Sequence, residues 1–586
     1  MKLVRVFSNK NFINIKFDEH FNVVLATIQD VVNKKDTHNL GKTSLVRVID
    51  FLLLGDFSKK KGLLSNPIFS GQVFYLEVLL NSGKYLVIRR SIDSATKISF
   101  HLDDIPLNGF DAPTSWNEED VAFDKAKDKL NEYLGFDVVT QWPYRKSVTY
   151  FLRTQQDYLD VFQLGKFKGG HSDWKPFVFD LLGFDGEIIA KKYDLDNQIE
   201  EKKKNYLTII NEANVNPEER DKILGMIDIK NQEKENALYS IDKFNFYSQD
   251  KKLTKEIIED LDIRIQTIST ERYRISYQIK KTEDSLRQTI EEINLEKMQE
   301  LFDDTKLFFP DELKKQFEDL ESFNAAISSE RKKYLKENLE KLRSEFSAVD
   351  EQIRSLESQK SEKLTFLTES DSYTKFKSYQ KQLSIVESEL ITLNEKLRLI
   401  DRSVEIQDEI KRIKLQLLQS KEEIQKEIGR QKHADLRRIF NQIIVDVVGT
   451  NAIISIKQND QGNVDYSAEY QNLQQISTSE SDGTTYKKLL CAAFDLSLLI
   501  HYSNKSFFRF VYHDGIFEGL DDRIKVRLLD SVKSICQQYN LQYIVSMIDS
   551  DIPKMQDGTP YPIQLSEICL QLNDRDDNGK LFKQSF

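Results

Sequence analysis

The sequence predicts an α/β head assembled from an N-terminal and a C-terminal lobe, with a long antiparallel coiled coil inserted between the lobes. Residues 1–186 and 433–586 alternate short apolar runs with turn residues, as mixed α/β folds do. Residues 187–432 are instead rich in charge and contain only Pro217 and Pro310 of the ten prolines. A chain of 586 residues is too long for one core, so two or three domains are expected.

The overall composition limits the class of protein. The net charge is −11, charged residues make up 31% of the chain and hydrophobic residues 39%. This apolar content is low for a fully globular chain and indicates that a large part packs along one seam only. An acidic total argues against a surface that is basic throughout, and it leaves a local basic face for nucleic acid open.

The sequence also bears on location. Three scattered cysteines, Cys491, Cys536 and Cys569, form no CxxC pair, so we expect reduced core thiols and no zinc site. The N-terminus does not resemble a signal peptide, and no run of 18 apolar residues occurs. We therefore expect a soluble cytoplasmic protein that does not enter a membrane.

The N-terminal lobe is expected to contain several strands, a hairpin turn around Asn81–Gly83 and a helix near Trp174–Leu182. The strand-like segments are Leu3–Phe7, Ile13–Phe17, Asn22–Thr27, Gln72–Leu80, Lys84–Arg90 and Val148–Leu152.

The middle segment carries a heptad pattern. Leu335, Leu342, Val349 and Leu356 recur every seven residues, interleaved with further apolar residues, which is the seam of a coiled coil. The simplest topology has one outgoing helix, a reversal around residues 302–323 and one returning helix. Each arm would then reach on the order of 150 Å, with kinks near 214–217 and 370–372. The alternative is a bundle of several shorter helices.

The C-terminal lobe resumes the α/β pattern after residue 432. The expected strands are Ile453–Ile456, Val464–Tyr470, Phe507–Tyr512, Leu541–Met547 and Glu567–Leu572. The expected helices are Thr485–His501 and Asp522–Tyr539, and a hairpin is expected around Asp577–Gly579.

A phosphate-binding loop is the main functional signal. The segment Asn39–Ser44 follows the apolar run Phe21–Ile28 and precedes an apolar helix that starts at Gly41-Lys42-Thr43. Backbone N–H groups at such a helix start face phosphates, the lysine adds charge, and the threonine hydroxyl suits Mg²⁺. Asp36 and Asn39 stand where glycines are usual, and both residue types tolerate left-handed backbone angles. The alternative is a chance Gly-Lys-Thr in a lysine-rich chain.

Three further segments are of the kind that would complete such a site. An apolar strand ends at Asp514, and Asp521 follows seven residues later. A loop containing Ser481 and Gly483 precedes an apolar helix. A glutamine pair, Gln155-Gln156, follows a predicted strand.

With these motifs the chain resembles an SMC/RecN-type ABC ATPase. It is most similar to the SMC-like ATPase component of bacterial ABC three-component or Lamassu-type defence systems. The closer resemblance rests on Asp36–Thr43, on Ser481–Lys488 and on His513–Asp521. It implies a P-loop ABC-type head, ATP and Mg²⁺ as cofactors, and a homodimer formed through ATP-bound heads.

The resemblance also assigns roles by position. It places Lys42 on the β- and γ-phosphates, and Thr43 and Asp514 at Mg²⁺. Gln155 would be a further ligand at Mg²⁺, and Gln156 is the alternative to Gln155 in this role. Asn39, Gly41 and Ser44 would complete the loop, Ser481 and Gly483 would act across the dimer, and Asp521 would belong to the D-loop.

Two departures concern catalysis. Gly515 stands where such ATPases keep a glutamate next to the attacking water, and Ile548-Asp549-Ser550 stands in place of a switch histidine. A group near the water is still required. Glu518, His513 and Asp549 are the candidates, so hydrolysis is expected to be weak or to depend on a partner.

The resemblance implies a DNA sensor or motor that controls an effector, such as a nuclease, with accessory subunits in anti-phage or anti-plasmid defence. Two other functions stay open: a housekeeping DNA-repair ATPase resembling RecN, and a scaffold that holds ATP without hydrolysing it. The sequence shows no triad and no nuclease-type carboxylate cluster, so the chain itself is not expected to be the nuclease.

Overall fold

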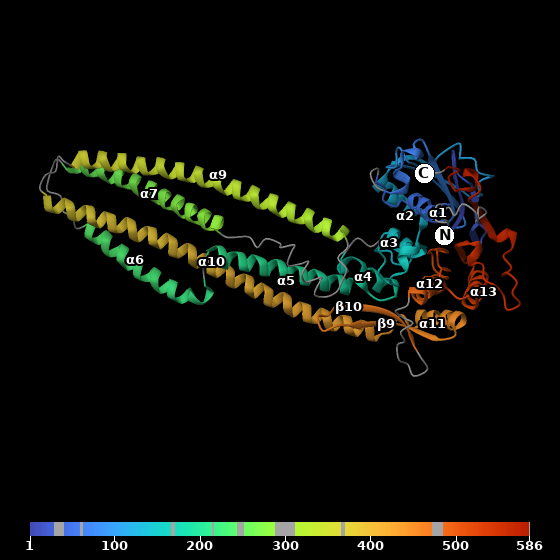
Figure 1. Ribbon diagram of the computed structural model, residues 1–586. Coiled ribbons are helices and arrows are strands. Elements are labelled where there is room, and N and C mark those ends of the chain that lie inside the picture. The colour runs from blue at the N-terminus through green and yellow to red at the C-terminus, as the bar shows by residue number, and fades with distance from the viewer. Residues whose placement is uncertain are drawn as a thin grey trace. The chain divides into compact units, whose positions relative to one another are not determined.

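A computed structural model describes residues 1–27, 40–58, 62–165, 170–213, 216–242, 251–287, 311–364, 370–471 and 484–584 (Figure 1). The chain forms two compact units. The first combines Met1–Asn197 with Lys414–Phe586 and is called the head below; the second, Gln198–Ile413, is called the helical unit. The expected boundaries near 186 and 432 lie at the start of helix α5 and just after the end of helix α10, whereas the two compact units divide within these helices.

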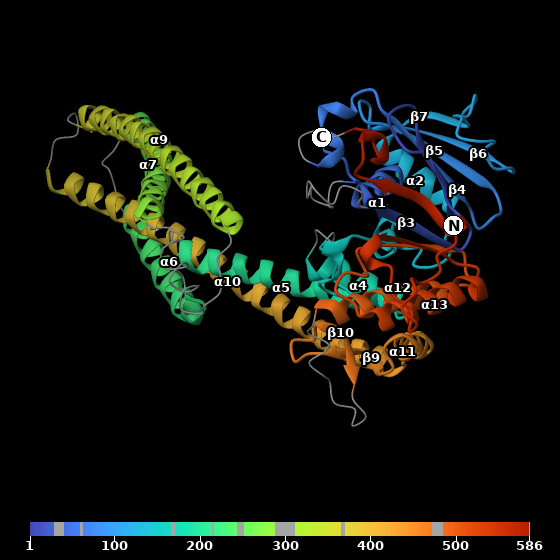
Figure 2. The ribbon, with the colours of Figure 1, turned by 45° about the vertical axis from the view of Figure 1, so that its right-hand side comes forward.

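The head contains an antiparallel sheet of six strands in the order β2-β1-β4-β5-β6-β7 (Figure 2). The strands are β1 Lys2–Ser8, β2 Ile15–Lys16, β4 Val73–Leu79, β5 Tyr85–Ser91, β6 Lys97–Asp103 and β7 Glu118–Ala122. The first four agree with the sequence predictions. Strands β6 and β7, together with helix α2 Phe123–Leu134, were not predicted, and β7 has no buried residue to mark it.

A parallel sheet of five strands joins the two ends of the chain in the order β13-β3-β12-β11-β8. The strands are β3 Phe21–Thr27, β8 Leu152–Arg153, β11 Phe510–Asp514, β12 Gln542–Ile548 and β13 Ile568–Asn573. Buried on both faces, β3, β11 and β12 read as continuous apolar runs, as strands of a covered parallel sheet do. Since β3 and β8 come from the N-terminal lobe and the others from the C-terminal lobe, the two lobes share one sheet.

Helices and one hairpin complete the head. The helices are α1 Lys42–Leu52, α3 Tyr144–Phe151, α4 His171–Leu181, α11 Ala434–Val448, α12 Thr484–His501 and α13 Asp522–Tyr539, with the first part of α5 Gly186–Ala213 and the last part of α10 Ser370–Gly429. Strands β9 Asn451–Gln458 and β10 Val464–Gln471 form the hairpin. Helix α1 contributes Leu45, Val48 and Ile49 to the core, all fully buried.

Two local predictions are wrong. Val148–Leu152 was expected to be a strand, but Tyr144–Phe151 form helix α3 and the strand β8 is only Leu152–Arg153. Helix α3 begins directly after Pro143, a position that proline favours, and its buried face produces the apolar run. Asp577–Gly579 form a 3₁₀ turn with Asp576 as its cap, where a hairpin was expected.

The helical unit is built from paired helices. They are the last part of α5, α6 Arg220–Asp242, α7 Lys251–Arg287, α9 Asp311–Leu364 and most of α10. Helices α7 and α9 are antiparallel, because ion pairs join Arg272 to Asp350 at 3.0 Å and Glu283 to Arg343 at 2.7 Å. Position numbers thus rise along one helix as they fall along the other.

Helix α10 makes two kinds of pairing. It runs antiparallel to α6, since Arg220 pairs with Asp401 at 2.6 Å and Lys234 with Glu387 at 2.8 Å. It runs parallel to α7, because hydrogen bonds join Gln266 to Glu387 and Tyr273 to Thr392. The chain direction therefore reverses between α6 and α7, between α7 and α9, and between α9 and α10.

The expected single hairpin is therefore wrong, and the alternative of several shorter helices describes this unit. Of the predicted reversal at 302–323, residues 302–310 lie outside the described residues and residues 311–323 belong to helix α9. Near 214–217, where a kink was predicted, the structure has two separate helices, since α5 ends at Ala213 and α6 begins at Arg220. A heptad pattern identifies the apolar seam of a helix and leaves its partner undefined.

We predict that Ile400→Ala destabilises the helical unit. Ile400 is fully buried in a cluster with Ile223, Ile227 and Val386, so its truncation should cost about 2–4 kcal/mol. Hydrogen exchange of the α6 and α10 amides measures this loss. The matched control is Ile391→Ala on the same helix, where the side chain is 47% exposed. Equal protection in the two variants would contradict the described packing.

Candidate functional site

The centre of the candidate site is a contact between the two ends of the chain. Thr43 lies in the first turn of α1, and Asp514 is the last residue of β11. The Thr43 hydroxyl donates a hydrogen bond of 2.6 Å to Asp514 Oδ2, across 471 positions of sequence. The predicted loop threonine and the predicted strand-end acid therefore meet.

A neighbouring strand holds the Asp514 carboxylate. The Ser546 hydroxyl on β12 donates to Asp514 Oδ1 and accepts a hydrogen bond of 3.3 Å from the Gly515 backbone N–H. Asp514 is fully buried, and its register partner on β12 is Ser546. The sequence analysis missed Ser546, although a hydroxyl near the end of an apolar strand beside the acid strand is a usable signal.

Lys42 lies among carboxylates. Burial lowers the pKa of the Lys42 ammonium, and the negative charges of Asp514, Asp551 and Glu518 oppose that shift. Asp551 was not predicted; it belongs to the 3₁₀ turn Asp549–Asp551 after β12 and accepts a hydrogen bond of 3.0 Å from the Ile548 N–H. A cation surrounded by carboxylates is a charge arrangement that suits a phosphate–metal complex.

The start of α1 has a glycine, Gly41, as its N-cap. Among the described residues no side-chain cap is present, and the first turn has no acidic residue. Its first N–H groups and the dipole of the helix therefore favour a negative group at this end. Ser44 lies in the same first turn, whereas Asn39 lies outside the described residues.

The C-terminal segment supports this loop. The Leu581 N–H donates to Leu40 O at 3.2 Å, and Leu581 O accepts from the Ile13 N–H at 2.9 Å. Gly41 has φ +103, and a Cβ there would lie 2.7 Å from Leu581 Cβ. Glycine at position 41 is thus required both by the backbone angle and by the close approach of Leu581.

A second polar cluster lies beside Asp514. Gln155 donates from Nε2 to Glu518 Oε1 at 2.5 Å. Lys488 Nζ on α12 lies 2.9 Å from Gly515 O and 3.4 Å from Glu518 Oε2. Gln155, rather than Gln156, therefore contacts the loop that follows Asp514, and Lys488 is a member of the cluster that the sequence analysis did not identify.

Gly515 has no room for a side chain. Its φ is +71, and a Cβ would lie 2.4 Å from Gln155 Cγ. This is the position at which the resemblance predicts a glutamate. The next carboxylate along the chain after Asp514 is that of Glu518, which reaches Gln155 from the far end of the same loop.

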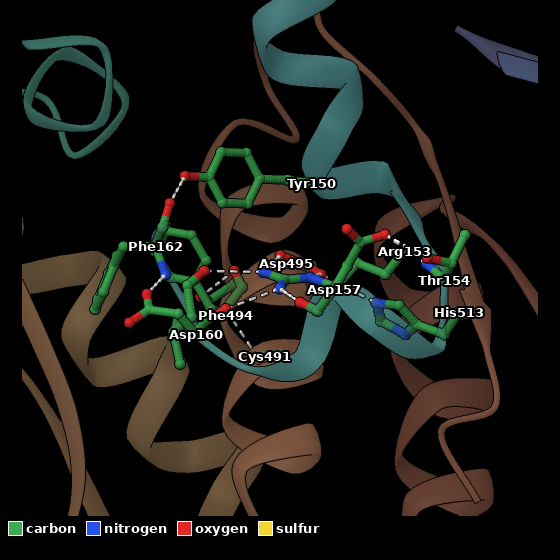
Figure 3. Close-up of polar contacts among 12 residues, drawn as sticks. Tyr150, Arg153, Thr154, Asp157, Asp160, Phe162, Cys491, Phe494, Asp495 and His513 are labelled. Atoms are coloured by element: carbon green, nitrogen blue, oxygen red, sulfur yellow. Dashed lines mark hydrogen bonds and ion pairs between the residues drawn. The ribbon is translucent and has the colours of Figure 1, made fainter. Parts of the chain in front are cut away.

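His513 is not part of either cluster. Its ring is fully buried, with Nε2 3.1 Å from Asp495 Oδ2 (Figure 3). Its Nδ1 lies 2.8 Å from the Tyr543 hydroxyl. Burial lowers the pKa of the imidazole, which favours its neutral form. Both nitrogens have partners, so His513 lies apart from the two clusters, and its catalytic role remains a prediction. A histidine next to the acid points to the opposite side of its strand.

The remaining predicted residues lie apart from the two clusters or outside the described residues. Asp521 caps helix α13 by accepting a hydrogen bond of 2.9 Å from the Arg523 N–H and is exposed. Asp549 begins the turn after β12 and is also exposed. Ser481 and Gly483 lie outside the described residues, and α12 begins directly after them at Thr484.

Two properties of the described residues complete the description. Within the described ranges, no group of three or more His, Cys, Asp or Glu side chains is arranged to hold a metal ion. Among the helices described, none combines the length and apolar character needed to cross a bilayer.

Comparisons with known proteins give distant matches. Residues 439–586 match a family described as an uncharacterised protein conserved in bacteria (DUF2326). Over 566 residues the chain is 21% identical to "Uncharacterized protein YydD" of Bacillus subtilis (strain 168), covering 91% of this chain and 90% of that protein.

Among solved structures, the chain is similar to Smc head domains. One from Pyrococcus yayanosii, with a coiled coil and joint, is 17% identical, covers 97% of both chains and has a TM-score of 0.36. One from Pyrococcus furiosus, with an extended coiled coil and bound to the C-terminal domain of ScpA, is 15% identical, covers 94% of this chain and 90% of its own, and has a TM-score of 0.32. These TM-scores are low, and these similarities therefore support no statement about the site residues.

We predict that Gly515→Ala destabilises the head by about 2–4 kcal/mol, because a left-handed alanine and an overpacked contact add their costs. The control is Gly83→Ala, at φ +85 with no atom within 4 Å of the added Cβ, which should lose only the backbone part, about 1 kcal/mol. Denaturant unfolding followed by hydrogen exchange in β11 measures both.

A second variant separates the two costs. Gln155→Ala removes the atoms that the new Cβ would meet, so adding it to Gly515→Ala should restore part of the lost stability. If Gly515→Ala lost no more stability than Gly83→Ala, the described contact between Gly515 and Gln155 would be incorrect.

Proposed function

We propose that this protein is an SMC/RecN-like ABC ATPase that binds ATP and Mg²⁺ where its two ends meet. The observation that carries the proposal is the hydrogen bond from Thr43 to Asp514, at the uncapped start of α1 and beside Lys42. Hydroxyl and carboxylate oxygens are the ligand types that Mg²⁺ prefers, usually together with phosphate oxygens and water. The residues present therefore fit the cofactor that the resemblance implies.

Each residue has a role in this proposal. Lys42 and the N–H groups of the α1 start bind the phosphates, Thr43 and Asp514 hold Mg²⁺, and Gln155 lies beside them. Ser546 orients the Asp514 carboxylate. When bound, Mg²⁺ neutralises charge that develops on the phosphates. As the resemblance implies, Asn39 and Ser44 would belong to the phosphate loop, Ser481 and Gly483 would act across a head dimer, and Asp521 would belong to the D-loop.

Glu518 is the proposed general base. In this role its carboxylate accepts a proton from the water whose oxygen bonds to the γ-phosphorus, while the bond to the bridging oxygen breaks and ADP leaves. Its present contacts with Gln155 and Lys488 occupy both carboxylate oxygens. Hydrolysis is therefore expected to be slow until those contacts are exchanged.

The wider function follows from the motif resemblance. The protein would dimerise through ATP-bound heads, engage DNA, and control an effector and accessory subunits in anti-phage or anti-plasmid defence. A housekeeping repair role resembling RecN is the alternative, and neighbouring genes separate the two, because a defence system brings an adjacent effector gene.

A second candidate function has its own support. Gly515 cannot carry a glutamate side chain, and Glu518 is already engaged, which favours a scaffold that holds ATP as a clamp without hydrolysing it. Such a protein would bind ATP tightly and release no phosphate.

Phosphate release by the purified protein, alone and with linear or circular DNA, tests the proposal. Lys42→Ala should reduce ATP affinity by about tenfold or more, because a charged contact to phosphate is lost. Glu518→Gln should keep ATP affinity and lower the release rate by about 10²-fold or more. Lys457→Ala and Glu422→Gln, at exposed head positions, are the matched controls.

The outcomes separate the candidates. DNA-stimulated release that both variants abolish supports the ATPase. ATP binding that requires Lys42 without any release supports the clamp. Unchanged ATP affinity in Lys42→Ala would contradict both.

A further inference from the structure

A buried charged network joins strands β8 and β11 with helix α12, close in sequence to Gln155, Asp514 and Lys488. Arg153 is the last residue of β8, two positions before Gln155; His513 is directly before Asp514 on β11; and Asp495 lies in the middle of α12. All three side chains are fully buried. Figure 3 shows them meeting at the Asp495 carboxylate.

The Asp495 carboxylate is the centre of this network. Arg153 approaches it with two groups, Nε at 2.5 Å and Nη2 at 2.9 Å, in a bidentate pair. His513 Nε2 lies 3.1 Å from Asp495 Oδ2, so the neutral ring donates there and its Nδ1 accepts from the Tyr543 hydroxyl. One carboxylate thus binds groups from β8 and β11, and through His513 it reaches β12.

Arg153 also shapes the loop that follows Gln155. Its remaining N–H groups donate to the backbone oxygens of Asp157 at 2.7 Å and Val161 at 2.9 Å. Thr154 and Asp157 form a capping box at the start of the turn Gln155–Tyr158. The position of the turn that presents Gln155 is therefore fixed by the guanidinium, and the guanidinium is fixed by α12.

We propose that Arg153 and Asp495 are positioning residues that transmit the placement of α12 to Gln155 and Asp514. This inference rests on the proposed function. Helix α12 begins immediately after the loop proposed to contact the partner head, and its Lys488 already contacts the loop of Glu518. A shift of α12 on head engagement would move Asp495 and, through it, both sides of the site. Neither residue touches the reacting atoms.

A paired substitution separates a positioning role of Arg153 and Asp495 from the energetic cost of burying their charges. Replacing a buried ion pair by apolar side chains of similar volume often leaves stability unchanged, whereas removing one partner leaves an unpaired buried charge. The paired change Arg153→Met/Asp495→Leu therefore removes the network while keeping the packing. The matched control is Arg5→Met/Glu77→Leu, a buried pair at 2.6 Å in the six-stranded sheet.

The experiment measures ATP affinity and phosphate release for the full chain with Mg²⁺ and linear double-stranded DNA. We expect Arg153→Met/Asp495→Leu to bind ATP within about threefold of the wild type and to release phosphate at least about tenfold more slowly. The Arg5→Met/Glu77→Leu control should keep both values. Arg153→Lys, which keeps the charge and loses the bidentate contact, should give an intermediate rate.

Two results would overturn the inference. If Arg153→Met/Asp495→Leu released phosphate at the wild-type rate, the network would be structural only. If that variant did not fold, Arg153→Lys would decide, and a wild-type rate in Arg153→Lys would count against the inference. Failure of the proposed function is distinguishable, because the wild-type protein itself would then bind no ATP or release no phosphate.

Discussion

The hydrogen bond between Thr43 and Asp514 links two segments that lie 471 positions apart, and the parallel sheet that makes it possible is shared between the two lobes. The candidate site draws on both lobes, because Thr43 belongs to the N-terminal lobe and Asp514 to the C-terminal lobe. The contact brings a buried carboxylate next to hydroxyl donors and beside Lys42, which limits the cost of burying its charge. In the sequence, the helical unit lies between the two segments that form the head.

The close packing of Gln155 against Gly515 limits which side chains the loop after Asp514 can carry. Gly515 and Gln155 approach so closely that a side chain at position 515 would require Gln155 to move, and the next carboxylate in the loop is that of Glu518. Gln155 and Lys488 hold this carboxylate from two different elements. In the proposed ATPase, the Glu518 carboxylate would become free for hydrolysis only when Gln155 and Lys488 of α12 exchange these contacts. The Arg153–Asp495 pair connects that helix to the rest of the site.

Much of the site could be predicted from local sequence, since Lys42, Thr43, Gln155 and Asp514 belong to motifs with fixed spacing. Asp551 and Lys488 could not be found in this way, because their contacts join elements distant in sequence, and Ser546 was not predicted although its strand-end position offered a signal. His513 is adjacent to the acid in sequence, so its side chain lies on the other face of the strand and outside the two clusters. The pairing of the helices in the helical unit was predicted wrongly, because heptads define the apolar seam of a helix, whereas tertiary packing selects its partner helix.

The central claim is that Thr43 and Asp514 act as one Mg²⁺-dependent nucleotide site. The most direct test is a double-mutant cycle on ATP affinity, with Thr43→Val, Asp514→Asn and the combined variant, each measured with Mg²⁺ and with a chelator. Two residues that share one bound ion should show a coupling free energy of about 0.5–3 kcal/mol with Mg²⁺ and none with the chelator. Additive losses with Mg²⁺ present would contradict the account.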